Sequence, residues 1–447
     1  MAKIPRATPA ASAPHSRSAE LGLLVIVWVI ITSLYILMFL ATKGHLPARL
    51  GAFLGVLVAV SLLMHVAIRR YAPRASQVLL PIATLLNGIG YVEIARWNPT
   101  RAGYQALWYV VSAVILVLTL KFVKSIRDLD RYRYLTLSAA ILLMLAPLVP
   151  HFGETINGAR LWVAVGPLSF QPIEIAKVLL VFFFASYFAA NRELLSTPTQ
   201  RLGRTLIVPP GVLAPILVAW GGALLILAGE NDIGFAMLLF VLFFALLWVT
   251  TGLRTYLALG AAMFVGGGII ADQLFHQVHQ RLSLMLDPWN YSATHGSFQI
   301  AYAQFSLAAG GIVGTGVGLG QSGNIPEISS DMIFATIGEE FGFIGVILLL
   351  SLFAAFVGEG FRIAQRSHSD FVRLTATGLT AIIGLQAFFI MAGILRIVPF
   401  TGITLPFMAY GGSSLFANYL IVALLLRISH ENGVEKRGGE VVAVTFD

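Results

Sequence analysis

The sequence predicts an all-α integral membrane protein that crosses the bilayer many times. Of its 447 residues, 57% are hydrophobic and only 11% are charged, whereas water-soluble proteins carry roughly 25% charged residues. Apolar runs recur along the chain at about the 20-residue length that a helix needs to cross the hydrocarbon core. These two observations exclude a soluble enzyme and a disordered chain. The absence of cysteine also excludes a secreted disulfide scaffold.

About twelve segments are predicted to span the membrane as helices. They are residues 21–41, 50–68, 78–95, 107–120, 134–149, 172–190, 212–228, 233–251, 256–275, 333–357, 374–397 and 407–426. The fourth and fifth are short, so we expect them to extend into their flanks. The first run is too long for the core of a signal peptide and is interpreted as a retained anchor.

The domain organisation follows from these runs and from the absence of an internal repeat. We expect one polytopic membrane domain at residues 19–430. A disordered cytoplasmic tail at 1–18 precedes it, and a cytoplasmic tail at 431–447 follows it.

The distribution of Lys and Arg predicts the orientation. When the N-terminus is placed in the cytoplasm, 21 basic residues fall inside and 7 outside, and Lys177 lies within a span. This is the positive-inside pattern, which predicts that both termini are cytoplasmic. The net charge of +8 then faces anionic lipid headgroups, so it does not require a nucleic-acid partner.

Two extracytoplasmic loops, at 151–170 and 276–330, are long enough to suggest a function. The second is rich in glycine and is expected to pack back onto the membrane domain. Its glycine run at 314–320 imitates a dinucleotide-binding fingerprint, but no strand or βαβ unit surrounds it, so close backbone packing or a tight turn is favoured. Four residues of this region could be metal ligands: Asp272, His276, His279 and His295. We favour the interpretation that they are solvated.

Ionisable residues within spans are candidates for function, because a charge in hydrocarbon is costly. Glu174 and Lys177 are three residues apart at the start of the sixth span, so they share a helix face and can pair. A self-neutralising pair near the outer interface is one interpretation. A charged lining of an outward-facing cavity is the interpretation we favour.

Carboxylates also mark the tenth span. Asp331 sits at its outer mouth, where it is either a residue that favours the helix dipole or a functional carboxylate. Glu339 and Glu340 lie roughly 12–14 Å deeper at 1.5 Å per residue, and we expect them to pair for structural reasons.

Small and polar residues follow the eleventh span. Thr401 and Gly402 precede the run at 410–414, which reads Tyr-Gly-Gly-Ser-Ser. Small residues let membrane helices approach closely, which is one explanation of this run. Arg396 has no obvious partner nearby in the sequence, and a guanidinium there suits a phosphate group.

The motifs and their order along the chain resemble the SEDS family of peptidoglycan glycosyltransferases, whose branches are RodA and FtsW. The matching segments are 157–162, 171–177, 231–234, 286–288, 298–299, 326–340 and 401–414. Ile173 stands where the family usually has Ser, Asn231 where it has Pro, and Phe298 where it has Tyr. The run at 410–419 resembles the RodA branch more than FtsW, and actinobacterial RodA above all. The family core has ten spans, which would correspond to about residues 77–430 here, so the first two spans are an addition.

The resemblance implies that lipid II is polymerised into glycan strands at the outer face of the bacterial cytoplasmic membrane, in elongation or division. It implies membrane lipids and a class B penicillin-binding protein as partners, and no organic cofactor. Asp331 becomes the candidate catalytic base, while cations and a divalent metal (Mg²⁺ or Mn²⁺, its ligands left open) would offset the pyrophosphate charge. The candidate substrate-binding residues are Arg160, Trp162, Gln171, Glu174, Lys177, Asp232, Gln299, Glu327, Arg396, Thr401, Gly402, Tyr410, Gly411, Gly412, Ser413 and Ser414.

Two other classes of function remain open. A lipid-precursor flippase or proton-coupled transporter would use Asp232, Glu174 and Lys177 as relay or substrate groups near the bilayer midplane. A scaffold without enzymatic activity would only recruit a transpeptidase, and it offers no reason for Asp331.

Overall fold

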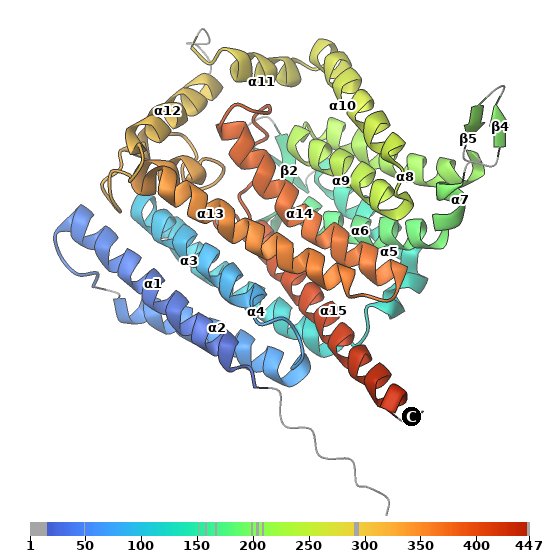
Figure 1. Cartoon of the computed structure of the whole chain (residues 1–447). Coiled ribbons are helices and arrows are strands. Elements are labelled where there is room, and N and C mark those ends of the chain that lie inside the picture. Colours follow the sequence, from blue (N-terminus) through green and yellow to red (C-terminus); the bar gives the residue numbers. More distant parts are fainter. Residues whose placement is uncertain are drawn as a thin grey trace, which may run out of the picture.

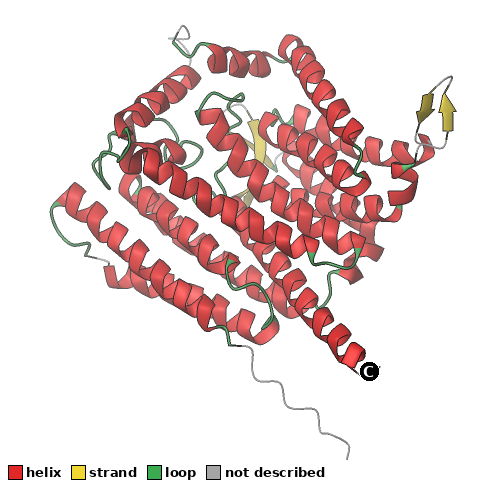
Figure 2. Cartoon of the chain, viewed as in Figure 1, coloured by secondary structure: helices red, strands yellow, loops and turns green. Residues whose placement is uncertain are grey.

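The computed structural model describes residues 16–48, 50–150, 152–156, 159–165, 168–197, 200–202, 205–207, 210–289 and 295–444. Within these residues, fifteen α-helices form most of the molecule, and two small sheets lie in the connections (Figures 1 and 2). The helices are α1 (Ser18–Lys43), α2 (Leu50–Tyr71), α3 (Leu79–Trp97), α4 (Pro99–Phe122), α5 (Arg133–Leu145), α6 (Ile173–Ala190), α7 (Arg192–Ser196), α8 (Pro210–Gly229), α9 (Ile233–Thr251), α10 (Arg254–Leu274), α11 (His276–Leu286), α12 (His295–Gly310), α13 (Ile333–Gln365), α14 (Asp370–Ile394) and α15 (Gly412–Val444). The strands are β1 (Gly153–Ile156), β2 (Ala159–Val165), β3 (Leu168–Phe170), β4 (Gln200–Leu202) and β5 (Thr205–Ile207).

Each of the twelve predicted spans overlaps a helix, although the fifth does not extend as expected, because α5 ends at Leu145. Among the described residues, ten helices are long and apolar enough to cross a membrane; the other two are α3, with 19 residues, and α5, with 13. The fourth predicted span extends as expected, because α4 begins at Pro99, where the Asn98 side chain accepts a hydrogen bond from the Arg101 N–H (2.9 Å). The protein is a multi-pass membrane protein, while the count of twelve spans stays a prediction.

The start of α1 and the end of α15 lie at the same end of the helix bundle, and α11 and α12 lie at the opposite end (Figure 1). This arrangement suits an even number of spans. Which end faces the cytoplasm stays a prediction from the distribution of Lys and Arg.

The structure extends into both segments that were expected to be tails. Arg17 is buried; its guanidinium pairs with Glu20 and donates to the Ala75 carbonyl (2.8 Å) between α2 and α3. At the other end, α15 continues through residue 431 to Val444 rather than ending near 430. Residues 1–15 of the expected disordered tail lie outside the described residues.

The protein is mostly helical, as predicted, and the segment 151–170 adds short strands that were not expected. There β1, β2 and β3 form an antiparallel sheet with β2 in the middle, in which Val163 lies opposite Gly153 and Phe170. Valine, tryptophan and leucine in β2 suit a pleated surface. A second hairpin, β4 and β5, protrudes from the helix bundle (Figure 2).

The glycine run after α12 packs against α13, as expected. A Cβ atom at Gly314 would collide with the Glu340 carbonyl, and the Thr315 N–H donates to the Glu339 carbonyl (2.9 Å). α13 departs from helical geometry at Gly342 (φ 63°), and the Phe343 N–H donates instead to the Gly311 carbonyl (2.9 Å). The loop thus satisfies backbone groups that the break in α13 leaves without helical partners.

Of the two deep carboxylates of α13, Glu340 is paired, as predicted, and Glu339 is held by a backbone N–H group. Glu340 pairs with Arg96 of α3 and accepts a hydrogen bond from the Gly318 N–H (2.7 Å). Glu339 accepts one from the Gln321 N–H (2.8 Å). These groups fix α13 and the glycine-rich loop against α3.

A first prediction concerns the contact between α3 and the segment before α15. A Cβ atom at Gly90 would lie 2.5 Å from the Met408 Cα atom, inside van der Waals contact with backbone. Gly90→Ala should therefore push the two apart and lower the free energy of unfolding by about 1–3 kcal/mol, measured by thermal unfolding in detergent. Gly22→Ala on α1 is the matched control, because nothing lies within 4 Å of its added Cβ atom. Equal melting temperatures of the two variants would contradict this account.

Candidate active site

Asp331 lies two residues before α13, in the turn that leads into this helix, and its side chain is partly exposed. The Ser330 hydroxyl oxygen lies within hydrogen-bond distance of Asp331 Oδ1 (3.2 Å) and of Glu327 Oε2 (3.1 Å). Burial raises the pKa of Asp331 to about 7, and the Glu327 carboxylate adds to the rise. Ser330 and the Arg281 guanidinium act in the opposite direction on this pKa.

Arg281 on α11 supplies the cation of the site. Its Nη1 atom donates to the carbonyls of Phe400 (3.0 Å) and Thr401 (2.7 Å). A Cβ atom at Gly402 would lie 3.8 Å from Asp331 Oδ2 and 3.9 Å from Arg281 Nη2, so both side chains converge on this glycine. Gly402 also has a φ of 68°, a backbone conformation that favours glycine.

Asp232 is the second carboxyl group that interacts with Arg281. It caps α9: its Oδ1 atom accepts a hydrogen bond from the Phe235 N–H (3.0 Å), while its buried Oδ2 atom has no hydrogen-bond partner among the described residues. Burial raises the pKa of Asp232 to about 6, and Arg281 opposes the rise. Gly234, in the first turn of α9, packs against Thr401, because a Cβ atom there would lie 2.8 Å from the Thr401 carbonyl oxygen.

The predicted ion pair of Glu174 and Lys177 is present, but it lies in the interior. The two side chains are 1% and 2% exposed, so they do not line an open cavity as we had favoured. Lys177 Nζ donates to Gln386 Oε1 (2.9 Å), and Gln386 Nε2 donates to the Thr404 carbonyl (3.2 Å). The pair therefore helps to hold the segment 401–411 in place through Gln386 of α14.

The start of α15 continues this polar network. Ser413 Oγ accepts a hydrogen bond from the Gln171 N–H (2.9 Å), and Thr404 Oγ1 donates to Ser414 Oγ (2.9 Å). At Gly412, a Cβ atom would collide with the Trp108 ring of α4. Gly412 thus serves close helix packing, and the two serines bind protein groups.

A third group of residues holds the loop before Asp331. Arg101 of α4 donates to Glu327 Oε2 (3.1 Å) and to Ser329 Oγ (2.8 Å), and its guanidinium lies 5.3 Å from the centre of the Tyr410 ring. The Tyr410 N–H donates to the Ser329 carbonyl (2.7 Å). Glu327 and Tyr410 are therefore brought next to Asp331, as the motifs suggested.

The remaining candidates contact other groups of the protein. Gln299 Nε2 donates to the Pro326 carbonyl (3.2 Å), and the Gly411 N–H is 3.5 Å from Gln105 Oε1. Arg160 Nη2 donates to the Val149 carbonyl (3.1 Å). The partner of Trp162 across the β1–β2 ladder is Glu154.

Arg396 also contacts backbone, although a phosphate was the partner suggested by its sequence. Its Nε and Nη2 atoms donate to the Met285 (2.8 Å) and Leu286 (2.6 Å) carbonyls. These carbonyls belong to the last turn of α11, the helix that carries Arg281. Arg396 therefore satisfies the end of α11 and helps to place the cation of the site.

Among the residues that the structure describes, no three or more His, Cys, Asp or Glu side chains form a metal-binding group. His279 Nδ1 lies 3.0 Å from Asp272 Oδ1 in an exposed pair. The His295 side chain lies outside the described part. The four metal-ligand candidates of this region thus gain no support.

Sequence reasoning missed Arg281 and Arg101. Both contact groups more than 100 residues away in the chain, so no local spacing reveals them. The two carboxylates at helix starts, Asp232 and Asp331, could have indicated that a cation lies nearby, because carboxylates withdrawn from water require a compensating cation.

A second prediction tests whether Glu174 and Lys177 on α6 serve to neutralise each other rather than to bind a ligand. Lys177→Met alone should destabilise the fold by about 3–5 kcal/mol, because it leaves the Glu174 carboxylate buried without a cation. The double variant Glu174→Leu/Lys177→Met should recover most of this loss, since no unpaired charge remains. Thermal unfolding of wild type, both single variants and the double variant in detergent gives the complete cycle. A double variant as unstable as Lys177→Met would show that the pair is not the source of the effect.

Comparison with known proteins identifies the family of this chain. The family model for cell cycle proteins of the FtsW, RodA and SpoVE type matches residues 91–433. The peptidoglycan glycosyltransferase RodA of Mycobacterium tuberculosis is 34% identical over 428 residues, covering 93% of this chain and 91% of the relative. A probable peptidoglycan glycosyltransferase FtsW of Polynucleobacter necessarius is 33% identical over 327 residues, covering 70% and 73%.

The fold agrees with solved structures at lower identity. A chain from a study of how a peptidoglycan synthase complex coordinates polymerization and crosslinking matches with a TM-score of 0.65 at 24% identity, covering 80% of this chain and 98% of that one. The rod shape determining protein RodA of Thermus thermophilus matches with a TM-score of 0.56, also at 24% identity, covering 80% and 97%. The family model and the relatives together show that this chain belongs to the FtsW, RodA and SpoVE family of cell cycle proteins.

Proposed function

We propose that this protein is a peptidoglycan glycosyltransferase that polymerises lipid II, with Asp331 as its catalytic base. The observation that carries the proposal is the placement of Asp331: a partly exposed carboxyl at the start of a membrane helix, next to the cation of Arg281. The RodA and FtsW relatives, named as peptidoglycan glycosyltransferases, support the same reaction.

In the proposed reaction, the acceptor sugar hydroxyl attacks the anomeric carbon of the donor. A new glycosidic C–O bond forms, and the bond from this carbon to the lipid pyrophosphate breaks. The ionised Asp331 carboxylate takes the proton of the attacking hydroxyl. A pKa of about 7 suits this role, because a general base works best when its pKa lies near the operating pH.

The departing pyrophosphate requires positive charge, and Arg281 is the best-placed candidate. Its Nη1 atom is held by two carbonyls, while its Nη2 atom lies near Gly402, where Asp331 also points. A planar guanidinium suits phosphate oxygens through parallel hydrogen bonds. Lys177 is too deeply buried for this role, and Arg160 and Arg396 donate to backbone carbonyls.

A divalent cation such as Mg²⁺ or Mn²⁺ fits the oxygen-rich character of the site. Mg²⁺ is usually held by one or two carboxylates together with substrate phosphates, so a three-carboxylate cluster is not needed. Asp232 would be its protein ligand, because no described residue donates a hydrogen bond to its buried Oδ2 atom. The ion would supply neutralisation of the pyrophosphate charge.

The proposal extends to the place and the partner of the reaction. The distribution of basic residues supports an orientation in which the end that carries Asp331 faces outwards from the bacterial cytoplasmic membrane, where lipid II would be consumed. A class B penicillin-binding transpeptidase is the proposed partner, in elongation or division. The structural match to a chain from a peptidoglycan synthase complex supports such a partner.

A lipid flippase or proton-coupled transporter is the alternative function. It would place ionisable groups near the bilayer midplane, where substrate and ion sites of transporters lie. Here Asp232 immediately precedes α9 and Asp331 lies two residues before α13, so both are at helix ends. A scaffold function would leave the convergence of Asp331 and Arg281 without a purpose.

A third prediction tests the catalytic base. Asp331→Asn keeps the shape of the side chain but cannot accept the proton, so the rate of glycan formation should fall by about 10²–10⁴-fold. The measurement is gel analysis of glycan strands formed from labelled lipid II by purified protein, with and without a partner transpeptidase. Glu339→Gln is a control for loss of a carboxylate elsewhere on α13. Full activity of Asp331→Asn would refute the proposal, and translocation of lipid II without polymerisation would favour the flippase.

A fourth prediction concerns pH. Because Asp331 must be ionised to act, the rate of polymerisation should rise with pH up to a pKa of about 7 and then level off. Arg281→Gln removes a charge that lowers this pKa, so the midpoint should move to higher pH. Glu327→Gln removes a charge that raises it, so the midpoint should move to lower pH. Initial rates across the pH range test both signs, and midpoints that do not move in opposite directions would contradict the assignment.

A further inference from the structure

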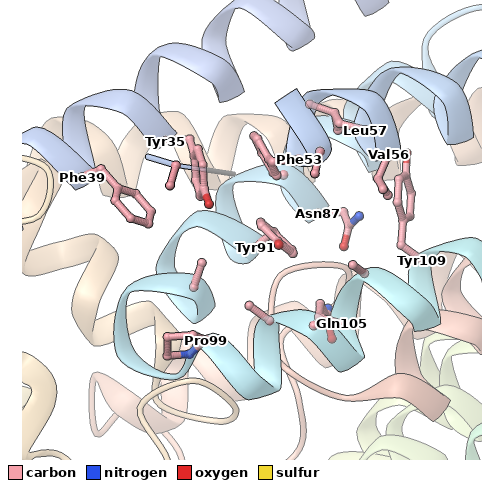
Figure 3. Close-up of a pocket in the computed structure, with 17 residues that line it drawn as sticks. Tyr35, Phe39, Phe53, Val56, Leu57, Asn87, Tyr91, Pro99, Gln105 and Tyr109 are labelled. Atoms are coloured by element: carbon pink, nitrogen blue, oxygen red, sulfur yellow. The ribbon is translucent and has the colours of Figure 1, made fainter. Parts of the chain in front are cut away.

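A cavity of about 480 Å³ lies between the helix pair α1–α2 and the helices α3 and α4 (Figure 3). Tyr35, Phe53, Asn87, Tyr91 and Tyr109 are among the residues that line it. All four helices contribute residues, so the cavity exists only because α1 and α2 cover this face of α3 and α4. It is separate from the convergence of Asp331 and Arg281, whose side chains do not line it.

We propose that this cavity binds the hydrocarbon chain of an anionic membrane lipid. Its walls are mainly apolar and aromatic: the Phe53 ring lies 4.2 Å from the Tyr35 ring and 5.0 Å from the Tyr91 ring, centre to centre. Packed protein interiors hold few voids larger than a water molecule. A volume of about 480 Å³ instead falls in the range of ligand sites.

The position of the cavity along the helices indicates which molecule can enter. Its lining begins near the α1–α2 connection, at Ala48, and near the start of α4, at Pro99. From there it extends about halfway along α4, to Tyr109. At this depth between membrane helices, the surrounding solvent is lipid, so a hydrocarbon chain is the expected occupant.

Charge and hydrogen bonding complete the description of the ligand. Lys43 is exposed in the last turn of α1, one turn beyond the lining residue Phe39, and would face an anionic headgroup. Asn87 lines the cavity and is only 4% exposed, and its Oδ1 atom has no hydrogen-bond partner in the part of the chain that the structure describes. An unsatisfied buried amide oxygen is costly, so a water molecule beside the bound chain would serve as its donor.

A ligand in this cavity would influence the candidate active site through α4. The lining residue Gln105 donates from Nε2 to the Ala409 carbonyl (3.3 Å), in the segment that precedes α15. One turn earlier on α4, Arg101 holds Glu327 and Ser329. A lipid that fixes α4 would therefore also fix the loops on both sides of Asp331.

The test compares two phenylalanine substitutions on α4. Gly103 lines the cavity and has no atom within 4 Å of an added Cβ, so Gly103→Phe should fill the space without a backbone clash. Val110→Phe is the matched control, because Val110 is exposed outside the cavity. Native mass spectrometry of the full chain in mild detergent should show one retained lipid on wild type and on Val110→Phe. Gly103→Phe should show about tenfold less, as expected for a loss of about 1.4 kcal/mol in affinity.

The mass of the retained lipid identifies its source. A diacyl phospholipid would show that the bilayer supplies the chain, and a polyprenyl phosphate or pyrophosphate would show that the reaction supplies it; either result supports the site. A wild type without retained lipid, or equal retention by Gly103→Phe, would overturn the proposal. The readout is binding alone, so its failure would leave the proposed transfer reaction untouched.

A second measurement covers the case in which Gly103→Phe does not fold. Wild-type protein would be photolabelled with a phospholipid and, separately, with a polyprenyl phosphate, each carrying a diazirine in the hydrocarbon chain. Labelling should fall on peptides of α2, α3 and α4 that contain Phe53, Tyr91 or Gly103. Labelling confined to other helices would overturn the proposal.

Discussion

The guanidinium of Arg281 is the charge on which the geometry of the site depends. Asp232 and Asp331 begin helices that are about 100 residues apart, yet both carboxyls interact with this cation. Without it, the pKa values of these two desolvated carboxyls would rise further above their usual range. Arg281 in turn needs the carbonyls of Phe400 and Thr401, so the turn before Gly402 becomes the common support of all three charged groups.

That turn is itself held by polar groups in the interior. Lys177 reaches Gln386, Gln386 reaches the Thr404 carbonyl, and Thr404 reaches Ser414 at the start of α15. Such a network is stable in a membrane protein only when its members are satisfied, because no water is available to replace a lost partner. Residues that the sequence suggests as substrate ligands are therefore better understood here as the groups that fix the position of the reactive ones.

The sequence predicts well what depends on local spacing. Apolar runs locate the helices, and the three-residue spacing of Glu174 and Lys177 predicts their pairing. It misses the features that depend on contacts between segments far apart in the sequence. The burial of that pair requires α14 above it, and the role of Arg396 requires the end of α11 nearby. Strands as short as β1 and β3 carry too few residues for a clear alternating pattern, so the small sheet is also unexpected.

The position of the charged groups along the helices also argues for chemistry at a membrane surface rather than for transport through the bilayer. Asp232 caps α9 and Asp331 precedes α13, so both carboxyls lie where a helix begins and where its backbone N–H groups are free. Those N–H groups favour negative charge, as do Arg281 and the exposure of the turn. A carboxylate can thus be ionised here without the full cost of a charge in hydrocarbon. Carboxyls at helix ends are also where the proposed polymerase would need them, because the polar groups of a lipid-linked sugar stay at the membrane surface.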